Sequence, residues 1–170
     1  MMAAATPVLN ILGGILMTEE IKAYVSVLCN LRDQVKKMLA EWPSEALDWR
    51  PIEGQGDLAT NSAAIITAHL AGSETFWMKE VIGRQPIHRD RDAEFRTKGK
   101  AASGLGALLD GAAKTTEEVL SSLKPEQLNE TRQVRDRTVT VRWSILHVIE
   151  HVAIHLGHLQ LMRQLWMIRQ

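Results

Sequence analysis

Four of the six histidines lie in the last stretch of the chain, residues 143–170. They are His147, His151, His155 and His158, spaced by four, four and three residues. On an α-helix that advances roughly 100° per residue, the four imidazoles fall within an arc of about 80° and share one face. Neutral imidazole is a preferred ligand of zinc, nickel, copper and iron. The spacing therefore predicts either a metal site or a very unusual core.

His151 and His155 form the preferred chelating pair, because residues four apart on a helix can reach one ion. A catalytic zinc site typically has three protein ligands and leaves a fourth position for water or substrate. His69 lies at the centre of another apolar helical pattern and is the predicted third ligand. His147 and His158 flank the pair, and each is a candidate for a fourth ligand, a group that contacts a ligand, or a proton carrier.

A second pair, His147 with His151, has the same spacing and stays open on spacing alone. It also completes the pattern H-x-x-E-H, which occurs in one class of zinc peptidases. Glu150 is rotated by roughly 100° from the neighbouring histidine, so in a helical bundle it would face away from the ion. The pattern is therefore a weak indication of a peptidase.

Four stretches of about twenty or more residues carry apolar side chains at helical spacing, and two or three long connections separate them. This organisation predicts an all-α fold, a four-helix bundle with long connections. The alternation in residues 129–141 permits a short β-hairpin before the last helix. Residues 84–100 are strongly charged and predict a solvated loop with local ion pairs, in which His88 is exposed. The expected helices are residues 18–42, 60–83, 102–123 and 143–170.

The length of 170 residues suits one domain. Met17 precedes Thr18, a helix-capping residue followed by two acidic residues, so we expect the bundle domain to comprise residues 17–170 and residues 1–16 to be a flexible extension. That extension lacks the basic start of a signal peptide and is too short to cross a membrane, so no membrane partner is expected.

The 20 basic and 20 acidic residues cancel, which gives no electrostatic case for a nucleic-acid partner. Cys29 is the only cysteine and cannot form an internal disulfide. It lies within an apolar helical pattern, where we expect it to be a small buried side chain. A single reduced cysteine suits a cytoplasmic protein.

Three segments resemble the DinB-like or YfiT-like bundles of metalloenzymes. Residues 65–77, Ile-Ile-Thr-Ala-His-Leu-Ala-Gly-Ser-Glu-Thr-Phe-Trp, are similar to that family's second helix, where a histidine precedes an aromatic pair. Residues 47–51, Leu-Asp-Trp-Arg-Pro, are similar to its approach to this helix, and residues 151–158 resemble its pattern H-x-x-x-H-R-G-Q. The order and spacing of the segments extend the resemblance over almost the whole domain.

The resemblance implies that His69, His151 and His155 bind a divalent metal ion, with zinc and nickel the usual candidates. It also implies that some relatives are S-transferases or isomerases that depend on a low-molecular-weight thiol, so we expect an enzyme that acts on a small molecule. Because a metal-bound water can likewise become hydroxide, a hydrolase is the other candidate. Leu156 and His158 stand where the family often has arginine and glutamine, which leaves the substrate open. The alternative is a non-catalytic, metal-stabilised bundle that acts as a binding module.

A homodimer is compatible with each of these functions. Trp166, Met167 and Ile168, at the end of the last helix, are the candidate contact residues. We expect them to be buried within one subunit, where large apolar side chains most often lie.

Overall fold

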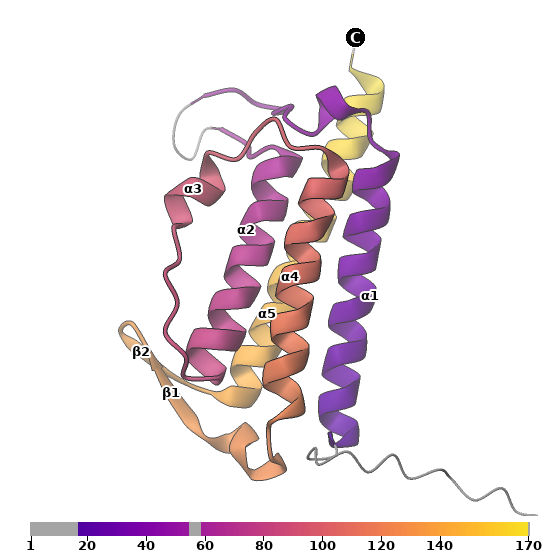
Figure 1. Cartoon of the computed structure of the whole chain (residues 1–170). Helices are drawn as coiled ribbons and strands as arrows, with labels where there is room; N and C mark the ends of the chain where they lie inside the picture. The colour runs from indigo at the N-terminus through magenta and orange to yellow at the C-terminus, as the bar shows by residue number, and fades with distance from the viewer. Residues whose placement is uncertain (1–16, 55–58, 170) are drawn as a thin grey trace, which may run out of the picture.

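The computed structural model describes residues 17–54 and 59–169, so the expected extension 1–16 lies outside the described residues and the domain division at Met17 stays a prediction. Four long helices form a bundle, with a short helix in one connection and a two-stranded hairpin in another (Figure 1). The predicted all-α bundle with long connections and a hairpin is confirmed. The elements are α1 (Glu19–Glu41), α2 (Ala63–Thr75), α3 (Arg91–Phe95), α4 (Ala102–Ser121), β1 (Thr131–Val134), β2 (Arg137–Thr140) and α5 (Val141–Ile168).

The long helices are not packed in simple chain order. Helices α1 and α2 each pack against both α4 and α5, so α1 and α2 lie at diagonal corners of the bundle (Figure 1). A chain that passes from one corner to the diagonal one needs a long connection. This topology therefore accounts for the stretch between α1 and α2, whose described part includes a short helical turn at Ser44–Ala46.

Helix α1 follows its sequence signals closely. The Thr18 hydroxyl accepts a hydrogen bond from the backbone N–H of Ile21 at 3.3 Å and so caps the first turn. Ile21, Leu28 and Val35 recur every seven residues and are fully buried. The helix ends before Pro43, because a residue that precedes proline is disfavoured in the helical conformation.

Helix α2 is the most enclosed helix. Ser62 caps it by accepting from the N–H of Ile65 at 3.3 Å. Residues on nearly its whole circumference are buried, so it lacks the single apolar face of a surface helix. It continues into a π-helical segment, Phe76–Ile82, and such wider turns often occur beside functional sites.

The hairpin fixes where α5 begins. Strands β1 and β2 pair antiparallel, with Thr131 opposite Thr140. Thr140 is also the capping residue of α5, and its hydroxyl accepts from the N–H of Trp143 at 3.1 Å. Because strand and helix meet at this residue, the hairpin sets the rotation of the helix that carries the histidines.

Two expectations about burial are wrong. Cys29 is exposed, because it is turned by roughly 100° from its buried neighbour Leu28. Met167 and Ile168 are 73% and 74% exposed, because the end of α5 projects beyond the other long helices (Figure 1). Trp166 is partly buried and packs edge-on against Trp49, with ring centroids 5.4 Å apart.

The described helices contain no stretch that is both apolar enough and long enough to cross a lipid bilayer.

Candidate metal centre

The three histidines predicted as ligands come together between α2 and α5. One potential ligand atom of each of His69, His151 and His155 lies within 4.8 Å of the others. Nε2 of His69 is 3.1 Å from Nε2 of His151, and the rings of His151 and His155 have centroids 4.6 Å apart. In a tetrahedral zinc site with ligand distances near 2.0–2.1 Å, two nitrogens lie about 3.3 Å apart. The donor set fits a divalent ion.

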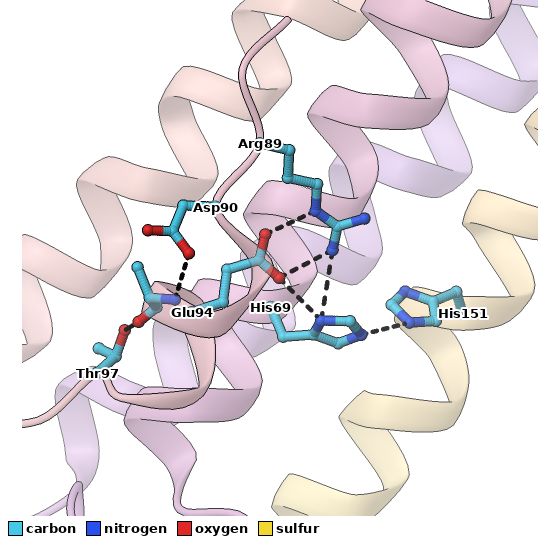
Figure 2. A network of polar contacts seen from close by, with 7 residues as sticks. His69, Arg89, Asp90, Glu94, Thr97 and His151 are labelled. Carbon is cyan, nitrogen blue, oxygen red and sulfur yellow. Dashed lines mark hydrogen bonds and ion pairs between the residues drawn. The ribbon is translucent and has the colours of Figure 1, made fainter.

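Glu94 contacts the ring nitrogen of His69 that points away from His151. Its Oε2 lies 3.0 Å from Nδ1 of His69, close enough to accept the Nδ1–H (Figure 2). That hydrogen bond selects the tautomer whose Nε2 lone pair faces His151. Metal-binding histidines usually donate their second nitrogen to a carboxylate or carbonyl in this way. The contact therefore supports a ligand role for His69.

Arg89 in turn fixes Glu94. Its Nε and one terminal nitrogen donate to the two oxygens of Glu94 at 2.6 and 2.8 Å, a two-point contact with little rotational freedom (Figure 2). Both side chains are largely buried, at 16% and 10% exposure. Asp90 caps α3 by accepting from the N–H of Ala93 at 2.8 Å, and this short helix presents Glu94 to the site.

Gly72, one turn after His69, makes room for this arrangement. A β-carbon at this position would lie 2.1 Å from Oε1 of Glu94, well inside contact distance. Any larger side chain would displace a carboxylate that Arg89 and His69 hold on its other sides. Glycine is thus needed here for a close approach and not for backbone conformation.

We expect Glu94→Ala to weaken zinc binding by about 10- to 100-fold, because His69 loses the acceptor that orients its ring. The binding of one ion per chain should persist, since all three imidazoles remain. Competition with a chelating dye at neutral pH measures the affinity. Asp92→Ala, in the same helix but exposed, is the matched control and should bind as the wild type. Equal affinity in the two variants would mean that Glu94 does not orient the site.

All three imidazoles are held neutral in the ion-free protein. Burial, together with the nearby His155 and His69, lowers the pKa of His151 to about 3. Burial and the neighbouring His69 and His158 lower the pKa of His155 to about 4. Burial also lowers the pKa of His69, although Glu94 opposes this. Neutral imidazoles keep the lone pairs that a metal ion requires.

We expect the ion-free protein to lose stability as the pH falls below about 6.5, the ordinary histidine pKa. Histidines of the unfolded chain then bind protons, whereas His155 and His151 of the folded chain bind them only near pH 4 and pH 3. Each histidine contributes at most about 1.4 kcal/mol per pH unit before solvent screening reduces it. Urea unfolding of chelator-treated protein at pH 7, 6 and 5 measures this slope. His151→Gln should make the slope smaller, because two of the three histidines remain, and a flat wild-type profile would contradict neutral imidazoles.

His147 and His158 lie at the two ends of the cluster, and neither belongs to the three-histidine group found among the described residues. The His147 ring stacks on Trp143, with centroids 4.9 Å apart and planes 8° apart, and meets the edge of Trp77. Nδ1 of His158 lies 3.3 Å from Nδ1 of His155. His158 is thus placed to touch a predicted ligand, and the roles of both flanking histidines stay predictions.

Glu150, the acid of the H-x-x-E-H pattern, points to solvent. Its side chain is 67% exposed, and it contacts His147 at 3.6 Å on the outside of α5. His88 is also exposed, as expected. A peptidase arrangement that uses Glu150 at the metal therefore has no geometric support.

The expectation for residues 84–100 is wrong in one respect. Much of this segment is exposed and charged, yet Arg89 and Glu94 turn inward against α2 and form the support of His69. Charge alone predicts solvation, and the path of a connection is not encoded in periodicity. The only sequence signal was Gly72, which has no β-carbon and follows His69 by one helical turn. This signal can be interpreted only with the structure.

The sequence model of the mycothiol S-transferase family matches residues 24–167, which include the three histidines, all of α2 and α4 and most of α1 and α5. The chain belongs to this family. The predicted resemblance to DinB-like and YfiT-like proteins is therefore confirmed. None of the curated proteins matches the chain in sequence.

Solved structures with a similar fold include two proteins from Bacillus subtilis. YfiT, described as a probable metal-dependent hydrolase with an unusual four-helix bundle topology, has a TM-score of 0.68 at 17% identity and covers 93% of this chain and 94% of its own. The DinB-like protein YjoA has a TM-score of 0.63 at 20% identity, over 84% and 90%. A conserved protein from Enterococcus faecalis has a TM-score of 0.68 at 15% identity, over 87% and 97%. At these identities the likeness shows the fold alone.

Proposed function

We propose that this mycothiol S-transferase family member is a metal-dependent S-transferase that uses a low-molecular-weight thiol, with mycothiol the thiol that the family's name indicates. His69, His151 and His155 hold the ion, with zinc or nickel the expected metal. The observation that carries the proposal is the convergence of these three neutral imidazoles, with ligand atoms within 4.8 Å, in a chain that matches the family over residues 24–167.

The three-histidine set suits chemistry better than a purely structural ion. Structural zinc sites are closed by four protein ligands, whereas three leave a position for a substrate atom. A bound divalent ion supplies Lewis acidity, which favours the deprotonated and nucleophilic form of a thiol. The protein itself orients His69 through Glu94 and Arg89 and keeps all three imidazoles neutral by burial.

His158 is the candidate proton carrier of the site. Its ring is exposed and its Nδ1 lies 3.3 Å from Nδ1 of His155, so it lies between a predicted ligand and solvent. A proton released from an incoming thiol has to leave the site, and an imidazole at this position is placed to accept it.

Hydrolysis is the second candidate, because YfiT is described as a probable metal-dependent hydrolase and shares the fold. The same open position that admits a thiol sulfur admits water. A non-catalytic, metal-stabilised bundle would instead require a closed site that includes His147 or His158. The cytoplasmic location and the homodimer stay predictions.

Cobalt substitution tests the thiol branch directly. Cobalt(II) protein should develop a new near-ultraviolet sulfur-to-metal absorption when a small thiol is added, and its visible bands should shift. The corresponding alcohol is the matched control and should leave the near-ultraviolet region unchanged. If cobalt binds but no thiol in a panel changes the spectrum, the transferase proposal fails and hydrolysis becomes the better candidate.

A further inference from the structure

A cavity of about 750 Å³ opens beside His155 and runs toward the C-terminal end of α5. His155 and His158 form one end of it, and the described walls are largely apolar. They include Trp49, Ile52, Ile66, Leu161, Met162 and Leu165. The size falls in the range of roughly 300–1,000 Å³ that is typical of small-molecule sites.

The cavity continues the faces that carry the three histidines. On α5, Met162 lies four residues after His158, and Leu165 lies three residues after Met162. Both therefore extend the face of the helix that carries His155 and His158. On α2, Ile66 lies one turn before His69. The faces that hold imidazoles at the metal site thus become hydrocarbon walls immediately next to it.

The cavity has little charge. Among the described residues that line it, Arg169 is the only lysine or arginine and there is no aspartate or glutamate. The Arg169 guanidinium stacks over the Trp166 ring at the rim. The Thr60 hydroxyl is already engaged with the backbone of Ile52, at 3.0 Å to its nitrogen and 3.3 Å to its oxygen.

Large apolar side chains gather at the mouth of this cavity although they are open to solvent. Ile52 is 57% exposed, Leu161 55% and Leu165 36%. A cluster of such side chains rather than a scattered few is typical of a binding surface. Their position beside His155 favours a ligand that enters the metal site over a partner that covers the surface.

We propose that this cavity binds the second substrate, a neutral and mainly hydrocarbon electrophile whose reacting end points toward His155. The inference rests on the proposed S-transferase function, because a transferase must bring an acceptor to the thiol. Low-molecular-weight thiols of cells are polar molecules, so an apolar wall suits the acceptor. Burial of its hydrocarbon part supplies affinity without a charged contact.

The test uses 2-naphthalenemethanol, an unreactive neutral aromatic probe, in calorimetric titrations of the metal-replete protein. The wild type should bind it, and Leu161→Gln should weaken binding by roughly five- to tenfold, because an amide replaces an apolar wall. Ile154→Gln is the matched control, since Ile154 lies on the same helix, is 52% exposed and does not line the cavity. Leu161→Gln combined with Leu165→Gln should weaken binding further. The single Leu161 variant and this double variant should keep their metal content.

Equal affinity in the Leu161 and Ile154 variants, or no binding to metal-replete wild type, would overturn the inference and leave the proposed function standing. If the double variant instead dissociates a dimer in sedimentation while the wild type binds no probe, the face is a subunit interface and the inference is wrong. If the wild type takes up no divalent metal yet binds the probe in a way that depends on Leu161, the proposed function is wrong. The ligand class assigned to the cavity is then still supported.

Discussion

His151→Ala should weaken zinc binding by more than about 100-fold, because it removes the middle imidazole of the predicted site. The His151 ring lies nearest to both others, with centroids 5.0 Å from His69 and 4.6 Å from His155, whereas those two rings are 5.5 Å apart. The two remaining imidazoles come from different helices and cannot chelate through a four-residue spacing. Competition against a zinc-binding dye at pH 7.5 measures the loss.

His88→Ala is the matched control for this prediction, because it removes an exposed imidazole that does not belong to the three-histidine group found among the described residues. It should bind one ion with wild-type affinity. A second variant, His151→Gln, keeps side-chain volume and should lose affinity as the alanine variant does. If His155→Ala retains wild-type affinity while His147→Ala and His151→Ala both lose it, the alternative pair of His147 with His151 would be the correct one.

Arg32→Met should cost about 3–5 kcal/mol of folding stability, because it leaves a buried carboxylate without its cation. Arg32 of α1 and Glu74 of α2 form an ion pair in the middle of the bundle, where they are 5% and 1% exposed. Thr116 of α4 donates to the same Glu74 oxygen, Oε1. The other oxygen is buried and has no hydrogen-bond partner among the described residues. Glu74 thus depends on very few contacts.

The pH dependence of this variant follows from Glu74. Burial raises the pKa of this carboxyl, with Arg32 and Thr116 acting against the rise. Loss of Arg32 removes one opposing contribution, so the carboxyl should be neutral over a wider pH range. The penalty of Arg32→Met should therefore be smaller at pH 5 than at pH 7.5, as measured by urea unfolding. Arg32→Met combined with Glu74→Gln should recover most of the lost stability, because no buried charge remains.

A surface ion pair that also joins α1 to another long helix supplies the control. Nζ of Lys36 in α1 lies 2.6 Å from Oδ1 of Asp110 in α4, but the two side chains are 37% and 61% exposed. Lys36→Met should change stability by no more than about 1 kcal/mol, since exposed pairs gain little. Equal losses in the Arg32 and Lys36 variants would mean that the buried pair carries no special weight.

The helices and the three-histidine cluster could be predicted from the sequence because both depend on local geometry. A helix turns by a constant angle, so His151 and His155 had to share a face wherever α5 lay. Thr18, Ser62 and Pro43 mark helix ends through contacts within a few residues. His69 could be added because the centre of a buried helix must face other helices.

The support of the site could not be predicted, because it depends on contacts between distant segments. Glu94 reaches His69 only because its connection folds back over Gly72, and no spacing rule encodes that path. Arg32 did carry a signal, as a charge within the apolar stripe of Leu28 and Val35. Its partner Glu74 follows His69 by five residues and became visible only in the packed bundle.

The most direct test of the metal centre is a crystal structure of metal-replete protein, with anomalous data collected at the absorption edge of the bound metal. One strong anomalous peak is expected among His69, His151 and His155, with three nitrogen ligands and a fourth position open toward the cavity beside His155. No peak at this place in protein shown to carry one ion per chain, or a site closed by His147 or His158, would contradict the metal-dependent transferase.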